Sequence, residues 1–112
     1  MTDRQITRGE VWWISLDPTQ GSEIRKTRPC VVLSHDTLNR LRRTVVVVPL
    51  SSAAKPHPPI TTPVTCQGES CVAVIDQIRA VAKHRLKSKI ECLDQDELDE
   101  VCQAVARILE IR

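Results

Sequence analysis

Residues 8–34 read RGEVWWISLDPTQGSEIRKTRPCVVLS, and this stretch predicts two strands joined by a charged loop. The apolar run that begins at Val11 is rich in the β-branched and aromatic side chains that favour a pleated, half-buried surface. Asp17-Pro18 ends this run, because proline has no N–H to give to a sheet. A second apolar run follows Pro29. A loop held at both ends by apolar strands is a rigid support for functional side chains, so we expect the chemistry of the chain here.

The composition indicates one domain, residues 1–112, with a core of valine, isoleucine and leucine. The formal net charge of +2 and the pI of about 8.4 do not by themselves indicate a nucleic-acid-binding protein. Because the chain has no Phe and no Tyr, Trp12 and Trp13 are its only large aromatic side chains. Adjacent residues of a strand point to opposite faces. Burial in the core is the default expectation for both, and one of them is a candidate for a dimer interface or for contact with a base.

No apolar run approaches the roughly 18 residues that a membrane span needs, and no signal peptide opens the chain. The five cysteines are odd in number and irregularly spaced. We therefore expect a reduced, cytoplasmic protein with no membrane partner.

Four further strands are expected, at residues 44–49, 60–66, 71–79 and 89–92. The first of these, TVVVVP, is apolar throughout and predicts a strand buried on both faces. The second contains Pro63 and predicts an edge strand, followed by a turn at residues 67–70. The third, CVAVIDQIR, predicts one continuous strand with a polar notch at Asp76-Gln77. The polar connection at residues 35–43 has room for a short helical turn.

The C-terminal segment predicts the one clear helix. Asp94 is a suitable N-cap, and Glu97 three residues later completes a capping box. The apolar side chains that follow repeat at helical spacing on one face, at Leu98, Val101, Cys102, Val105, Ile108 and Leu109. Several short strands followed by a closing helix predict a mainly β (α+β) fold, a small barrel with a helix packed on it.

Four blocks of the chain carry a family signature, RGEVWWISLDPTQGSE, KTRPCVVLS, TVVVVPLSS and VIDQIRAVAKHRL. In order and spacing they resemble the MazF/PemK toxins of type II toxin–antitoxin systems, over nearly the whole chain. The resemblance implies a small SH3-like barrel, shared with CcdB-type gyrase poisons, that forms a homodimer. It also implies a sequence-specific endoribonuclease (an mRNA interferase) acting on single-stranded RNA and held off by a cognate antitoxin. Operator DNA, reached through the antitoxin, is a further candidate partner.

The resemblance implies a catalytic set at Arg28, Ser51, Glu23 and Asp76. Arg28 matches the arginine that family members use in catalysis. Ser51 stands where the family has a threonine, so the hydroxyl is kept and the methyl is lost. Some relatives also have an arginine two residues before the aspartate and a histidine in the first loop. This chain has Val74 at the first position, and Gln20 or nearby polar residues in that loop, so a mechanism built on those two groups does not transfer.

Cleavage of RNA without a metal needs a base for the ribose 2′-OH, an acid for the leaving 5′-oxygen and fixed donors for the charge on phosphorus. Arg28 suits the third role, and could also deliver the proton, because its fork of donors matches phosphate oxygens. The plainer alternative is a surface ion pair with Glu23, which is otherwise the candidate base. Ser51 is expected to donate to the scissile phosphate, although a serine can also simply end a strand. Asp76 is expected to orient the loop or Arg79, or to have a structural role.

The residues expected to bind RNA are Thr19, Gln20, Arg25, Lys26, Thr27 and Arg79. Arg40, Arg42 and Arg43 could also follow an RNA backbone, although isolated charges more often form a solvated face.

No cofactor and no metal is expected. Cys66 and Cys71 flank a turn, but no second pair of cysteines or histidines at zinc-ligand spacing accompanies them. A cysteine nucleophile is not expected either, because no histidine and acid can be identified for it, and Cys30, Cys71 and Cys102 fit apolar patterns. Two alternatives to a ribonuclease stay open: a gyrase-poisoning toxin of the same fold, and a degenerate paralogue that only binds an antitoxin or DNA.

Overall fold

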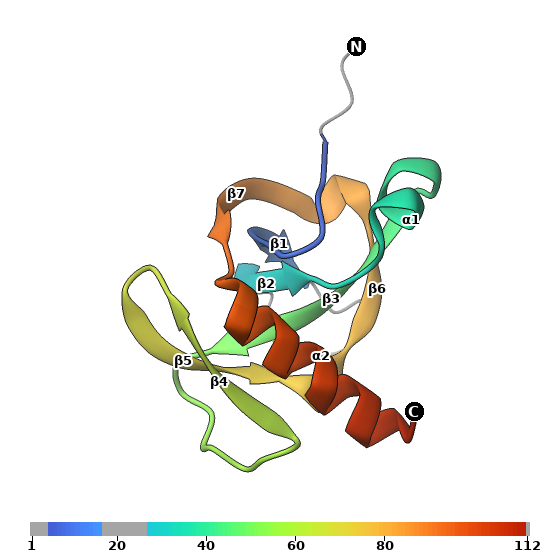
Figure 1. Cartoon of the computed structure of the whole chain (residues 1–112). Helices are drawn as coiled ribbons and strands as arrows, with labels where there is room; N and C mark the ends of the chain where they lie inside the picture. Colours follow the sequence, from blue (N-terminus) through green and yellow to red (C-terminus); the bar gives the residue numbers. More distant parts are fainter. Residues whose placement is uncertain (1–4, 17–26, 112) are drawn as a thin grey trace, which may run out of the picture.

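The computed structural model describes residues 5–16 and 27–111. The strands are β1 (Glu10–Ser15), β2 (Thr27–Val32), β3 (Thr44–Ser51), β4 (Thr61–Cys66), β5 (Glu69–Val74), β6 (Arg79–Ala82) and β7 (Leu86–Cys92). The helices are α1 (Asp36–Leu41) and α2 (Gln95–Leu109), and the single 3-10 turns are η1 (Ile75–Gln77) and η2 (Lys83–Arg85). The predicted mainly β fold with a C-terminal helix is confirmed (Figure 1).

The strands form a curled antiparallel sheet in the order β4-β5-β3-β2-β1-β7, with β6 paired to β3 beside this path. Figure 1 shows the β4–β5 hairpin extending away from the half-barrel formed by the other strands, with α2 lying across the sheet. The strand that contains Pro63 is at the edge, as predicted. Within the described residues no helix is long and apolar enough to cross a membrane.

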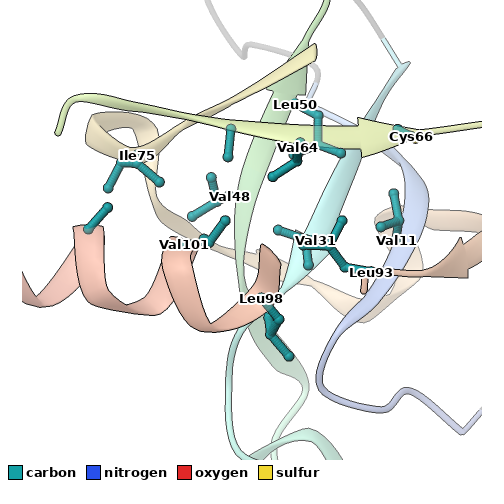
Figure 2. Close-up of a cluster of buried hydrophobic side chains, with 12 residues drawn as sticks. Val11, Val31, Val48, Leu50, Val64, Cys66, Ile75, Leu93, Leu98 and Val101 are labelled. Atoms are coloured by element: carbon teal, nitrogen blue, oxygen red, sulfur yellow. The ribbon is translucent and has the colours of Figure 1, made fainter. Parts of the chain in front are cut away.

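β3 is the centre of the sheet, and side chains on both of its faces are buried. Val45 and Val47 share a buried cluster with Trp12 on one face. Val48 and Leu50 alternate with them and share a second cluster with residues of α2 on the other face (Figure 2). The prediction of a strand buried on both faces is confirmed. A sheet that is packed on both faces leaves mainly the ends of its strands available for a functional site.

The helix α2 covers the second cluster with its buried side chains, Leu98, Val101 and Ala104. The predicted N-cap is confirmed, since the Asp94 carboxylate accepts a hydrogen bond from the backbone N–H of Asp96 at 3.2 Å. Glu97, expected to complete a capping box, instead accepts hydrogen bonds from the backbone N–H and the hydroxyl of Thr65, both at 3.1 Å. Thr65 lies on the edge strand β4, so this carboxylate satisfies an N–H that has no neighbouring strand.

The prediction of one strand over residues 71–79 is wrong. β5 ends at Val74, η1 intervenes, and β6 begins at Arg79. The chain breaks here because it changes its position along β3, with β5 paired to the end of that strand and β6 to its beginning. Ile75 is fully buried in the cluster under α2, while Asp76 is exposed and therefore not a polar notch inside a strand. The last strand also begins earlier than expected, at Leu86.

Candidate active site

A cavity of ≈ 420 Å³ opens where β2 begins, β3 ends and the β4–β5 hairpin turns back. Four segments line it: β1 at Trp13, the first residues of β2, the end of β3 with the residues after it, and the tip of the hairpin. These segments are far apart in the sequence and meet only because of the strand order. The cavity is of a size that small ligands or single nucleotides occupy.

Arg28 and Ser51, two residues of the predicted catalytic set, both line this cavity, together with Thr27 of the predicted RNA-binding set. Arg28 is half-buried, and its backbone lies opposite Ile14 of β1 in the sheet. β2 and β3 are adjacent antiparallel strands, so the beginning of one lies beside the end of the other. The sheet thereby brings together a guanidinium and a hydroxyl that are 23 positions apart in the chain.

The Ser51 hydroxyl oxygen accepts hydrogen bonds from the backbone N–H groups of Ala53 and Ala54, each at 3.1 Å. Its backbone pairs with Val72 of β5. Both side-chain contacts use the oxygen as an acceptor, so the hydroxyl proton remains available for donation. A serine fixed in this way can donate a hydrogen bond to an anion in the cavity without first reorganising.

The expected burial in the core is found for Trp12 but not for Trp13. Trp12 is buried and donates from Nε1 to the Glu10 carboxylate at 2.9 Å. The same carboxylate accepts from the Thr7 N–H at 2.9 Å and forms an ion pair with Lys89 of β7 at 3.2 Å. Trp13 is not a core residue: it is half-buried and lines the cavity. Because adjacent residues alternate in direction, the buried anchor at Trp12 directs the neighbouring indole to the site.

Two cysteines of the hairpin line the cavity as protonated thiols. Burial, and then a hydrogen bond to Glu91, raises the pKa of Cys66 to about 12. Burial, and then the charge of Glu97, raises the pKa of Cys71. A nucleophilic cysteine needs its pKa shifted in the other direction. The cysteines are therefore poor nucleophiles, and the guanidinium of Arg28 and the hydroxyl of Ser51 remain the candidate catalytic groups, with the exposed carboxylate of Glu69 also on the lining.

Arg79 and Asp76 do not line the cavity. Arg79 is exposed on β6, across β3 from the strand that carries Arg28. Burial raises the pKa of the Cys30 thiol from 9.0 to about 12, and the charges of Arg79 and Arg28 both act to lower that pKa. The two guanidinium groups therefore lie within electrostatic reach of the same buried sulfur. Asp76 is exposed on η1.

The remaining predicted site residues lie outside the described parts of the chain: Thr19, Gln20, Glu23, Arg25 and Lys26. Within residues 5–16 and 27–111, no three His, Cys, Asp or Glu side chains are grouped so that they could hold a metal ion. The sequence reasoning missed the hairpin tip from Gln67 to Ser70 as a wall of the site. Its turn was predicted, but nothing in the local sequence indicates that this turn faces Arg28.

Comparison with known proteins gives concordant matches. Residues 7–109 match the family described as PemK-like, MazF-like toxin of type II toxin–antitoxin system. Endoribonuclease MazF9 of Mycobacterium tuberculosis is 38% identical over 115 residues, covering 95% of this chain and 98% of that protein. The crystal structure of MazF from Deinococcus radiodurans superposes with a TM-score of 0.83 at 25% identity, over 97% of this chain and 100% of that one.

A mycobacterial endoribonuclease solved in complex with its cognate antitoxin has a similar fold, with a TM-score of 0.79 at 18% identity over 98% of each chain. The family match spans every strand and the whole of α2. The match in sequence and the match in fold agree, and they make this chain a member of the PemK-like, MazF-like toxins of type II toxin–antitoxin systems.

Proposed function

We propose that this toxin is an endoribonuclease that cuts single-stranded RNA, including mRNA, at a short sequence motif, without a metal ion, by attack of the ribose 2′-hydroxyl. Family membership and the relative named endoribonuclease MazF9 support the enzyme class over a gyrase-poisoning toxin of the same fold. The observation that carries the mechanism is the pairing of Arg28 and Ser51 on one cavity. A guanidinium and a hydroxyl with an available proton are suited to hold a phosphate.

In this mechanism the 2′-oxygen attacks the adjacent phosphorus, and the bond from phosphorus to the 5′-oxygen breaks. The products are a 2′,3′-cyclic phosphate (or its hydrolysis product) and a free 5′-hydroxyl. Arg28 stabilises the negative charge that grows on the phosphoryl oxygens, and Ser51 donates a hydrogen bond to one of them. Glu23 is the candidate base for the 2′-OH, and Asp76 has an orienting role. The group that protonates the 5′-oxygen is either Arg28 or water.

RNA binding is proposed to begin at the cavity and to extend over the first loop. Trp13 offers a half-buried ring on which a base can stack. Thr27 lies beside Arg28 at the start of β2. The loop residues Thr19, Gln20, Arg25 and Lys26, with Arg79 of β6, would contact the rest of the strand. The 2′-OH requirement distinguishes RNA from DNA in this site.

The experiment uses a long single-stranded RNA and the full-length protein, with mapping of the cleaved ends. Cutting is expected to persist in excess EDTA. A single 2′-deoxy substitution immediately 5′ of a mapped scissile phosphate should stop cutting at that phosphate alone. Products with 5′-phosphates, or efficient cutting of the deoxy-substituted strand, would refute the mechanism. A folded toxin that leaves RNA intact would refute the enzyme and favour a binding toxin.

The full chain, 1–112, is proposed to act as one domain in a homodimer. An apolar groove of ≈ 310 Å³ lies between α1, β3 and α2, lined by residues such as Leu38, Val46 and Val105. Leu41 beside it is 67% exposed. A second copy related by a two-fold axis would cover this apolar surface on both subunits.

Leu41→Arg should shift the protein toward monomer in light scattering at micromolar concentration. Ile60→Arg is the matched control, because Ile60 is another exposed isolated apolar side chain (39% exposed) that does not line the groove. A wild-type protein that is monomeric in the same measurement would refute the proposed homodimer.

The cognate antitoxin is the proposed regulatory partner, supported by the family and by the solved toxin–antitoxin complexes of similar fold. Operator DNA would be reached through that antitoxin. Because mRNA is the proposed substrate, the cytoplasm is the proposed place of action.

A further inference from the structure

The tip of the β4–β5 hairpin has an unusual residue at its turn. Cys66 and Glu69 are paired, so the loop contains only Gln67 and Gly68. Both have positive φ, +55° and +77° respectively. Two-residue hairpins favour such turns, but they place Asn, Asp or Gly at the first position. Gln67 therefore occupies a backbone conformation that most L-residues avoid, in place of residue types that would fit it better.

The turn is held from outside the hairpin. The backbone N–H of Gln67 donates to the Glu91 carboxylate of β7 at 2.8 Å. Two positions earlier on the same strand edge, Thr65 donates to Glu97 of α2. Carboxylates from two other elements thus take the place of a further strand along the edge of β4. Because each is anchored on a regular element, the hairpin tip has a fixed position relative to the cavity.

The side chain of Gln67 is available for binding. Its backbone N–H is bonded to Glu91, but in the parts of the chain that the structure describes its side-chain amide forms no hydrogen bond. The residue is exposed and lines the cavity that also contains Arg28 and Ser51. An amide offers a donor and an acceptor together, and this combination matches the edge of a nucleobase.

We infer that Gln67 is a specificity-determining residue, which reads one base of the RNA beside the scissile phosphate, and that Glu91 is the residue that positions it. This inference rests on the proposed ribonuclease function and adds the recognition of a base to it. Single-stranded RNA presents unpaired base edges that a side-chain amide can read. A glycine or asparagine at position 67 would give an easier turn, so the backbone does not explain the glutamine, whereas a function of its side chain does.

The test is a pool of single-stranded RNAs randomised around one cut site, sequenced after partial cleavage. Gln67→Ala keeps the strained backbone and removes the amide, whereas Gln67→Gly removes both. Gln103→Ala, an exposed position on α2 away from the cavity, is the matched control. Both Gln67 variants should lose preference at one nucleotide position by about 10-fold, the scale of a good amide–base contact. The control should keep the wild-type preference.

An unchanged motif in both Gln67 variants, or a uniform loss of cleavage at every sequence, would overturn the assignment while leaving the ribonuclease function intact. A wild-type protein that cuts no RNA would instead refute the proposed function itself. Glu91 is tested in the same pool. Glu91→Ala should weaken preference at the nucleotide that Gln67 reads, and Glu91→Gln, which keeps an acceptor for the Gln67 N–H, should restore most of it. Wild-type preference in Glu91→Ala would refute the positioning role.

Discussion

Removing the guanidinium of Arg28 is the sharpest perturbation of the proposed site. The backbone of Arg28 is held in the sheet opposite Ile14, and that pairing does not depend on its side chain. Among the described residues no carboxylate forms an ion pair with it. Arg28→Ala should therefore change the free energy of unfolding by less than about 1 kcal/mol, because the backbone pairing is kept and no ion pair among the described residues is lost.

The expected loss in catalysis is much larger. Removing one preorganised donor from a charge-stabilising site costs roughly 100- to 1,000-fold in rate. A guanidinium can present two donors and a full charge to the phosphoryl oxygens. We therefore expect kcat/KM to fall at least about 1,000-fold, which corresponds to about 4 kcal/mol of transition-state stabilisation. Arg28→Lys keeps the charge but loses the planar fork, so it should retain an intermediate rate.

The assay is cleavage of a short RNA with a single mapped site, measured as kcat/KM for the wild type and both variants. Urea unfolding of each protein shows whether the fold is kept. Thr27→Ala is a suitable neighbour for comparison, since it lines the same cavity but is proposed only to bind RNA. A folded Arg28→Ala protein with cleavage within about 10-fold of wild type would refute the assignment of transition-state stabilisation to this residue.

Three further outcomes follow from the contacts. Ser51→Thr should stay active and Ser51→Ala should lose about 10- to 100-fold in cleavage rate, because the site needs a hydroxyl donor; equal rates for all three would leave Ser51 as a strand end. Trp12→Phe should lower the free energy of unfolding in urea by roughly 1.5–3 kcal/mol, since the buried Glu10 carboxylate loses a donor; no change would mean that water replaces the indole. Burial raises the pKa of Cys30 from 9.0 to about 12 on folding, so between these pH values the thiol ionises only in the unfolded state. The stability of the fold is therefore unaffected below pH 9 and falls as the pH rises toward 12, by up to about 1.4 kcal/mol per pH unit. Cys30→Ala should accordingly flatten the alkaline loss of stability, and an unchanged slope would contradict the buried-thiol assignment.

The elements that could be predicted from the sequence are those whose pattern is local. The buried strand of residues 44–49, the edge strand with Pro63 and the capped helix after Asp94 each have a periodicity or a cap of their own. The prediction of one strand at residues 71–79 failed because the break in that strand has no local signal. This run is apolar on both sides of η1, and its break comes from a change of pairing along β3, which is a property of the whole sheet.

The candidate site likewise has a part that could be predicted from the sequence and a part that could not. The family resemblance supplied Arg28 and Ser51, and the structure places both on one cavity. The contribution of the hairpin could not be derived, because Gln67 meets Arg28 only through the order of β4, β5, β3 and β2. A signal was nevertheless present, since Gln-Gly is a poor choice for the backbone of a two-residue turn, and this motivates the proposed role of the side chain.

The proposed catalytic residues and the proposed recognition residue are held in place by different interactions. Arg28 and Ser51 are fixed by backbone pairing at the ends of β2 and β3, two strands inside the sheet. Gln67 is on a turn that is fixed by side-chain carboxylates at the edge of the sheet. A substitution at the turn therefore disturbs neither the cores nor the spacing of the catalytic pair. On the proposed assignment of Gln67, substitutions in the hairpin should change the recognised RNA motif while the proposed cleavage chemistry stays constant.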